Sequence, residues 1–179
     1  MALRPSLAST NRTQSAGRQL KRALRVGIGF DVHQLVSGVP LVLGGVAIEH
    51  PRGLAGHSDG DVIAHALIDA LLGAAGLGDI GSLFPSEDEC WKGADSLDLL
   101  AQAYAEVRGA GWALVNADCV LIGEEPRIAP RREEMQRRLA EAIDAEPGRV
   151  TVRATSTDGI GFTGRGEGLA AQAVALLER

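Results

Sequence analysis

The sequence predicts one globular domain of the α+β (α/β) class. Its 179 residues are 45% hydrophobic and 23% charged, which is the balance of a single folded domain. A chain of about 150 residues buries roughly two-thirds of its unfolded surface, so a full core can form without disulfides or a structural metal. Strand-like and helix-like segments follow one another along the chain, and this alternation predicts the class.

The first 24 residues differ from the rest of the chain in charge. They contain basic side chains and no acidic one, whereas the whole chain has 18 Lys and Arg against 23 Asp and Glu. We predict a flexible basic leader over residues 1–24 and an acidic folded domain over residues 25–179. The leader also has the composition of an organellar transit peptide, so a plastid location is the alternative to a cytoplasmic one.

Composition excludes several classes of function. An acidic domain lacks the basic footprint that duplex DNA requires, and 3% aromatic residues leave few platforms for stacking bases, so we expect no nucleic-acid partner. No apolar run reaches the roughly 18 residues of a membrane span, so we expect no membrane. Cys90 and Cys119 lack a CxxC spacing and are expected to be reduced packing residues of a cytoplasmic protein.

The N-terminal part of the domain is predicted to form two strands and a helix. Residues 25–33 are an apolar run broken by glycines, and residues 40–48 are a second run interrupted at Gly44-Gly45. A turn near Ser37-Gly38 joins them. Residues 61–75 follow as a buried helix, because apolar side chains cover most of the helix surface.

The rest of the domain continues the alternation. Ser58 or Asp59 can cap the first helix, and residues 78–88 are predicted as a loop. A helix, a strand, a helix and a strand then follow, over residues 95–109, 113–122, 126–144 and 149–156. The third helix can hold Pro126 in its first turn. Residues 168–178 are apolar on both alternating faces, so periodicity does not decide between strand and helix there.

Ionisable side chains recur at two spacings that bring them to one face. Asp31 and His33 are two residues apart at the end of the first strand, so both project from the same face. Asp61, His65 and Asp69 follow at i, i+4 and i+8 along one stripe of the apolar helix. Asp31, His33 and His65 together suit zinc with an open fourth position, which is typical of a catalytic site. The alternative is a hydrogen-bonded core histidine and a turn aspartate.

Two further segments have the residues to bind phosphate. His57 and Ser58 stand just before the first helix, where free backbone amides and the helix dipole attract an anion. Near the C-terminus, residues 155–158 and the glycine-rich run with Arg165 combine hydroxyls, amides and a carboxylate, which can hold phosphate and a second cation. A flexible turn is the alternative there. The GxGxxG pattern in that run is no dinucleotide site, because too little chain follows it.

Six motifs occur in one register between Arg25 and the C-terminus. They are GFDVH at 29–33, GHSDGD at 56–61, HALIDALLG at 65–73, GDIG at 78–81, LFP at 83–85 and GFTGRGEG at 161–168. Through them the chain resembles the 2-C-methyl-D-erythritol 2,4-cyclodiphosphate synthase family of the non-mevalonate isoprenoid pathway. The resemblance implies a mixed four-stranded β-sheet flanked by α-helices with a β-α-β-α-β-β core. It also implies a strand at 168–178, and a homotrimer with a site at each subunit interface.

The resemblance also gives each candidate site residue a role. It implies Zn²⁺, or a similar divalent metal, on Asp31, His33 and His65, with a substrate phosphate oxygen as fourth ligand. The methylerythritol phosphate pocket would be formed by His57, Ser58, Asp79, Gly81 and the loop from Phe84 to Asp88. The cytidine diphosphate would be received by residues 123–129 and by Thr155, Ser156 and Asp158, with Mg²⁺ or Mn²⁺ on Asp158. Phe162 and Arg165 resemble the residues at the mouth of the trimer channel.

The implied reaction converts 4-diphosphocytidyl-2-C-methyl-D-erythritol 2-phosphate to the 2,4-cyclodiphosphate with release of CMP. The 2-phosphate of the substrate is the nucleophile, so the protein needs none. His57 and Ser156 would be the catalytic residues, because both can donate hydrogen bonds to charge developing on phosphate oxygens. Ser156, Asp158 and Ser86 stand where the family commonly has Thr, Glu and Asp, and each keeps a related polar group.

Two other functions stay open on the residues alone. A zinc phosphohydrolase would use the open metal position to activate water and would make no cyclic diphosphate. A non-catalytic trimer that binds isoprenoid diphosphates through Arg165 would not turn over the cytidylated substrate.

Overall fold

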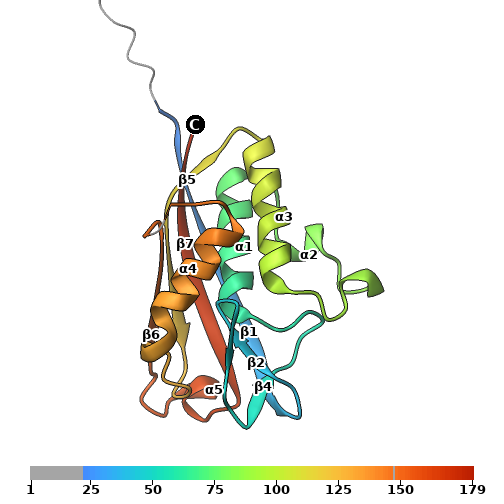
Figure 1. Ribbon diagram of the computed structural model, residues 1–179, viewed down its shortest axis with the longest axis vertical. Coiled ribbons are helices and arrows are strands. Elements are labelled where there is room, and N and C mark those ends of the chain that lie inside the picture. The colour runs from blue at the N-terminus through green and yellow to red at the C-terminus, as the bar shows by residue number, and fades with distance from the viewer. Residues whose placement is uncertain (1–21, 147) are drawn as a thin grey trace, which may run out of the picture.

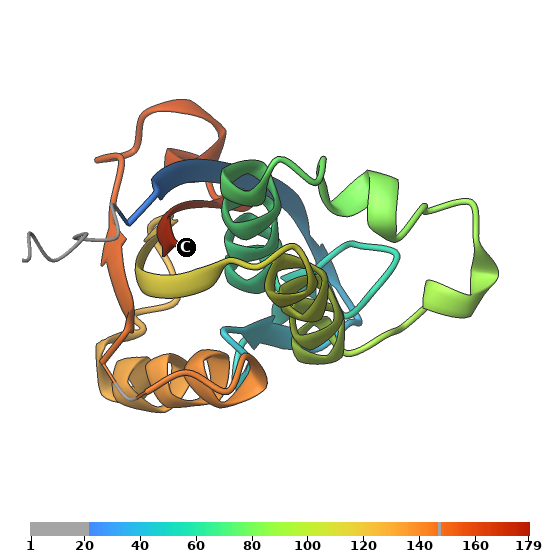
Figure 2. The ribbon, with the colours of Figure 1, turned by 90° about the horizontal axis from the view of Figure 1, so that it is seen from above.

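A curled sheet with helices packed on one side forms the fold of residues 22–146 and 148–179, which the computed structural model describes (Figures 1 and 2). The strands are β1 (Leu24–Ser37), β2 (Leu41–Leu43), β3 (Val46–Ile48), β4 (Arg52–Leu54), β5 (Ala113–Ile122), β6 (Val150–Thr155) and β7 (Gly168–Glu178). The α-helices are α1 (Val62–Ala75), α2 (Ile80–Leu83), α3 (Ser96–Gly109), α4 (Arg132–Ala142) and α5 (Gly161–Gly164). Two 3-10 turns are η1 (Glu89–Trp91) and η2 (Ala129–Arg131).

The predicted leader, residues 1–24, lies outside the described residues except for its last three. Leu24 is already the first residue of β1 and pairs with Glu178 of β7. The Arg22 guanidinium lies 2.8 Å from the Glu178 carboxylate. Residues 22–24 therefore belong to the folded part, and the predicted boundary falls a few residues too late.

The main sheet has five strands, in the order β4-β1-β7-β5-β6, where the resemblance implied four. Its four longest strands form the expected mixed arrangement, because β7 pairs antiparallel with β1 and β5 while β6 pairs parallel with β5. The fifth strand arises because β1 runs on to Ser37 instead of ending at His33. Its extra residues pair with the short β4, from Leu35↔Leu54 to Ser37↔Arg52.

Several predicted elements are confirmed closely. The strands at 113–122 and 149–156 correspond to β5 and β6, and residues 168–178 form β7, a strand buried between β1 and β5. The helix predicted over 95–109 is α3, one residue shorter. The run at 40–48 forms a β2–β3 hairpin around the glycine pair at which the sequence breaks.

Three local predictions are wrong in detail. The cap of α1 is Asp61 rather than Ser58 or Asp59, because its carboxylate accepts the N–H groups of the first turn. The predicted loop 78–88 contains α2, which Asp79 caps. The third helix begins only at Arg132, so Pro126 lies outside it, beyond the intervening turn η2.

Helix α1 is the centre of the molecule. It packs on β1 and β7 and, on another side, on α3 (Figure 2). Close approach to β1 requires Gly27 and Gly29, where a Cβ atom would lie 2.0 Å from the Ala70 carbonyl oxygen and 1.9 Å from that of Ala66. Most α1 residues are consequently buried, as the sequence predicted.

The two cysteines differ in environment. Cys119 is buried in the core, as expected for a packing residue, but Cys90 is exposed in η1. Within residues 22–146 and 148–179, every helix is too short or too polar to cross a bilayer.

Candidate active site

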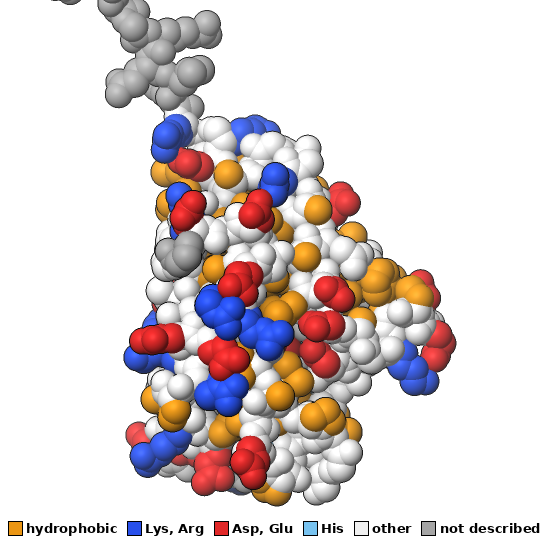
Figure 3. Space-filling model, in the orientation of Figure 1, with side chains coloured by type: hydrophobic (Ala, Val, Ile, Leu, Met, Phe, Trp, Pro, Cys, Tyr) orange, Lys and Arg blue, Asp and Glu red, His pale blue; other side chains and the backbone are white. Residues whose placement is uncertain are grey.

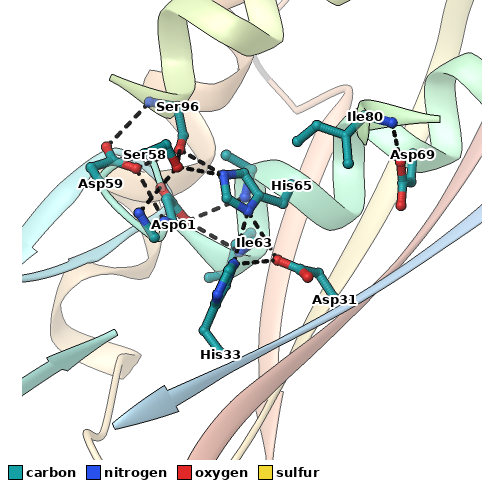
Figure 4. Close-up of polar contacts among 12 residues, drawn as sticks. Asp31, His33, Ser58, Asp59, Asp61, Ile63, His65, Asp69, Ile80 and Ser96 are labelled. Carbon is teal, nitrogen blue, oxygen red and sulfur yellow. Dashed lines mark hydrogen bonds and ion pairs between the residues drawn. The ribbon is translucent and has the colours of Figure 1, made fainter. Parts of the chain in front are cut away.

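One face of β1 packs against α1. This face carries the glycines that contact the helix backbone and two of the candidate metal ligands. Residues at i and i+2 of a strand share a face, so Gly27, Gly29, Asp31 and His33 all point the same way. The two glycines bring the helix backbone close, and the two polar side chains then meet His65, which lies on α1 (Figure 4). The fold thus brings all three candidate metal ligands into one cluster, as the sequence predicted.

Three donor atoms of this cluster form a small triangle. Asp31 Oδ2 lies 2.8 Å from His33 Nε2 and 3.0 Å from His65 Nδ1. The two ring nitrogens are 3.0 Å apart. Zinc binds such nitrogen and oxygen donors at about 2.0–2.2 Å, so one ion can contact all three atoms. The donor set therefore fits a divalent metal with at least one position left for a substrate oxygen.

Electrostatics in the cluster favour an ion pair in the metal-free chain. Burial opposes ionisation of the Asp31 carboxyl, but its interactions with the neighbouring His33 and His65 rings outweigh burial and hold the pKa of Asp31 well below its usual value. Burial also disfavours charge on His33, yet the hydrogen bond and negative charge of Asp31 raise the pKa of His33. A metal ion thus competes with a proton at the His33 ring.

The other ring nitrogen of His65 faces two hydroxyl groups. His65 Nε2 lies 3.0 Å from Ser58 Oγ and 2.9 Å from Ser96 Oγ. Ser96 is fully buried and bonds in turn to Asp59 (Figure 4). The sequence analysis missed Ser96, because a serine beside the Asp95 cap of α3 has the pattern of an ordinary helix start.

The two other acids of the predicted α1 stripe serve the backbone. Asp61 is fully buried and accepts the N–H groups of Gly44 and Gly45, and burial raises its pKa to about 6. Asp69 accepts the N–H of Ile80 at 2.8 Å, which fixes the start of α2. Of the three residues on the stripe, His65 alone belongs to the cluster of three donors.

A pocket of about 410 Å³ opens over the cluster. Its wall combines the three donors with residues of the predicted substrate pocket, namely His57, Ser58, Gly81 and, from the predicted 84–88 loop, Phe84, Ser86 and Glu87. Ile80, Trp91 and Leu99 complete the wall. Asp79 and Asp88 do not line it. The Asp79 carboxylate caps α2, and the Asp88 carbonyl accepts a hydrogen bond from His57 Nε2 at 3.2 Å. Trp91, which sequence reasoning missed, packs edge-to-face on Phe84 with ring centroids 5.0 Å apart.

The predicted cytidine diphosphate segment lies elsewhere on the chain. Thr155, Ser156, Asp158, Phe162 and Arg165 do not line this pocket. Thr155 ends β6, Ser156 and Asp158 lie in the loop between β6 and α5, and Phe162 and Arg165 lie in and just after α5. This loop is at the end of the molecule opposite the C-terminus (Figure 1).

That loop is held in shape by Glu124. Its carboxylate accepts the N–H groups of Thr157 at 2.9 Å and Gly159 at 3.3 Å. Ser156 Oγ donates to the Asp158 carboxylate at 3.0 Å, and Asp158 has a left-handed φ of 52°. The single chain thus builds two separate polar sites, one at the His-Asp cluster and one at this loop.

Comparison with known proteins decides the family, since residues 24–178 match the YgbB family over nearly the whole chain. The chain belongs to the YgbB family. The 2-C-methyl-D-erythritol 2,4-cyclodiphosphate synthase of Geobacillus kaustophilus (strain HTA426) is 56% identical over 155 residues, which are 87% of this chain and 98% of that relative.

Two solved structures of the family have the same fold. The bifunctional IspDF from Campylobacter jejuni superposes with a TM-score of 0.85 and 44% identity, over 88% of this chain and 42% of that longer one. A 2C-methyl-D-erythritol-2,4-cyclodiphosphate synthase in a CDP-bound form has a TM-score of 0.78 and 38% identity, over 86% of this chain and 99% of that one. As a member of this family the protein is an enzyme. The synthases of the family are lyases that form the 2,4-cyclodiphosphate and release CMP in the methylerythritol phosphate pathway.

Proposed function

We propose that Asp31, His33 and His65 hold a zinc ion at which this chain cyclises 4-diphosphocytidyl-2-C-methyl-D-erythritol 2-phosphate. The observation that carries the proposal is the convergence of three metal-binding atoms in the wall of a pocket large enough for a small phosphorylated substrate. When bound, the metal supplies a Lewis acid and an anchor for a substrate phosphate oxygen.

The residues of the pocket would bind and orient the methylerythritol phosphate. His57 and Ser58 stand beside the N-terminus of α1, where a hydroxyl and an imidazole N–H can donate to phosphate oxygens. Phe84, Trp91 and Leu99 form the apolar wall and exclude water from the reacting groups.

Positioning is the main task of such a site, because the substrate carries its own nucleophile. An oxygen of the 2-phosphate forms a bond to the β-phosphorus, while the bond from that phosphorus to the bridging oxygen of CMP breaks. CMP leaves with that oxygen and its electron pair. Holding the two phosphates together in this geometry can supply up to roughly 7–11 kcal/mol of the barrier reduction.

The loop anchored by Glu124 would receive the cytidine diphosphate. Thr155 and Ser156 offer hydroxyl groups, and Ser156 Oγ can turn from Asp158 to the diphosphate as charge develops there. Asp158 would hold Mg²⁺ or Mn²⁺, because a carboxylate next to phosphate oxygens is the usual environment of these ions.

A homotrimer would bring the two polar sites of neighbouring chains together. The outer face of β1 supports this proposal, because Leu24, Val26, Ile28, Phe30 and Val32 are 40–68% exposed along it. Such a continuous apolar face is a typical subunit interface. The outward surface of α4 is different, since acidic and basic side chains mix there (Figure 3), including the Arg137–Glu141 pair. Phe162 and Arg165 would then lie at the trimer channel.

We also place the enzyme in the cytoplasm. Cys90 and Cys119 are both free thiols, as in proteins of reducing compartments.

Mass spectrometry of reaction products tests the proposed function. Purified protein with zinc, magnesium and the cytidylated substrate should yield the cyclic diphosphate and CMP in equal amounts. Chelation should stop turnover, and adding both metals back should restore it. Linear bisphosphate and CMP would instead identify a phosphohydrolase, and no turnover with metals present would leave a binding protein.

A further inference from the structure

A chain of hydrogen bonds runs away from the metal site on the far side of the His65 ring. His65 Nε2 lies 2.9 Å from Ser96 Oγ, and the Ser96 hydroxyl bonds to the Asp59 carboxylate. The Ser96 side chain has 0% exposure, so water does not compete for these bonds. The three residues come from α1, α3 and the segment before α1, and Figure 4 shows the Ser96 hydroxyl, with that of Ser58 beside it, between Asp59 and the His65 ring.

The direction of each bond in this chain follows from the donors available. The Asp59 carboxylate already accepts the N–H of Asp61 at 3.1 Å and the N–H of Ser96 at 3.2 Å, and a carboxylate is an acceptor only. The single hydroxyl proton of Ser96 is therefore donated to Asp59. Its oxygen keeps only lone pairs for His65, so in the bond between Ser96 and His65 the proton is on Nε2. Ser58 Oγ lies 3.0 Å from the same nitrogen and can accept this proton as well. A lone pair on Nε2 could accept from Ser58 but would face the lone pairs of the buried Ser96 oxygen at 2.9 Å, which is unfavourable.

This direction determines which ring nitrogen can bind a metal. A neutral imidazole with a proton on Nε2 has its free lone pair on Nδ1. His65 Nδ1 is the atom that faces Asp31 and His33. The opposite tautomer is also possible in principle, because Asp31 Oδ2 at 3.0 Å would accept a proton from Nδ1. The buried chain of bonds selects between the two.

We propose that Asp59 and Ser96 are positioning residues that hold His65 in the tautomer and ring orientation required for metal binding. This inference rests on the metal site of the proposed function. Partners on the far nitrogen of a metal-binding histidine commonly act in this way, and their loss typically weakens metal affinity about 10- to 100-fold.

Zinc affinity, measured by competition with a chromophoric chelator, tests the role of Ser96. Ser96→Ala should raise the zinc dissociation constant about 10- to 100-fold. Ser96→Thr keeps the hydroxyl and should restore most of the affinity. Thr163→Val is the matched control, because it removes another buried hydroxyl, bonded to Thr157 rather than to the His65 ring, and should bind zinc as the wild type does.

A spectroscopic measurement separates positioning from packing. In ¹⁵N NMR spectra of the metal-free protein, His65 should be protonated on Nε2 in the wild type and shift toward Nδ1 protonation in Ser96→Ala. Asp59→Asn should weaken zinc binding as well, because an amide cannot replace both acceptor oxygens. If Ser96→Ala does not fold, zinc binding by Asp59→Asn tests the inference instead.

Two results would overturn the inference. One is a folded Ser96→Ala protein that binds zinc as tightly as the wild type, and the other is a Ser96→Thr protein as weak as Ser96→Ala. Failure of the wild type itself to bind zinc would instead refute the metal site of the proposed function.

Discussion

Asp31 and Asp61 show how the partners of a buried carboxyl decide its charge. Asp31 is partly buried beside two imidazoles, and its interactions with them outweigh burial and lower its pKa. Asp61 is fully buried, and burial raises its pKa to about 6 although the backbone amides of Gly44 and Gly45 donate to it. The neighbouring imidazole rings thus make Asp31 a metal-binding anion, whereas Asp61 joins the β2–β3 hairpin to α1.

The pKa shifts in the Asp31–His33 pair predict how the stability of the metal-free protein depends on pH. The lowered pKa of Asp31 contributes stability above its ordinary value of 3.8, and this is lost as pH falls through the folded value. The raised pKa of His33 contributes stability that is complete below its ordinary value of 6.5 and is lost as pH rises through the folded value. Both contributions act together between these two ordinary values.

Thermal unfolding of the wild type and Asp31→Asn, both with chelator, measures this dependence. The difference in Tm should be largest near about pH 5 and should shrink toward about pH 8. A difference that grows steadily above pH 6 contradicts the assigned ion pair.

The sequence predicts the ligands of the site better than it predicts what holds them. Spacing alone brings Asp31 and His33 to one face, and His65 is the ionisable residue at the middle of an apolar helix. Ser96 is 31 residues from His65 in the chain, and only the packing of α3 on α1 brings them together. The same limit hides the bond between Asp61 and Gly44, because local spacing does not reveal a contact between distant segments.

At the scale of elements, the site depends on how closely α1 lies against β1. Gly27 and Gly29 leave room for the α1 backbone at Ala70 and Ala66. His65 directly precedes Ala66, so it lies on the same turn of α1 as the contact with Gly29. The sequence analysis interprets these glycines as breaks in an apolar run, since a close approach between two elements becomes visible only in three dimensions.

A methyl group at Gly29 should therefore damage both stability and metal binding. In Gly29→Ala the new Cβ would lie 1.9 Å from the Ala66 carbonyl oxygen, so α1 must move away from β1. We expect a loss of about 3 kcal/mol or more in the free energy of unfolding, and weaker zinc binding. Urea unfolding and zinc titration measure the two effects.

Gly109→Ala is the matched control for this substitution. Nothing lies within 4 Å of a Cβ atom at Gly109, which is in α3. It should be neutral or gain up to about 1 kcal/mol, and zinc binding should not change. Equal effects of the two substitutions would show that close packing of α1 is not what limits the site.

At the scale of the whole molecule, the helices cover one side of the sheet and leave apolar side chains on the other. Figure 2 shows α1, α3 and α4 together on one side. On β1 the side chains of Val26 and Ile28 are 68% and 63% exposed. Strand alternation predicts which residues share this face, but a single sequence does not show what covers it. The proposed trimer covers it and joins the cytidine loop of one chain to the pocket of another.

A charge placed on this face should break the assembly. Light scattering of the wild type should give three times the chain mass of 18.7 kDa. Ile28→Glu should give a folded monomer with little activity, because burying an unpaired carboxylate in an interface is costly. Ala105→Glu, at an exposed position of α3, should remain a trimer with full activity. A wild-type monomer that is fully active contradicts the interface model.

The most direct test of the account is one preparation of His65→Ala, examined for zinc content, circular dichroism and reaction products. We predict that it contains almost no zinc and makes almost no cyclic diphosphate, while its spectrum stays that of the wild type. Its fold should survive, because the hydrophobic core around α1 does not depend on a metal. A folded His65→Ala protein that still forms the cyclic diphosphate without zinc would contradict the central claim that Asp31, His33 and His65 hold the catalytic metal.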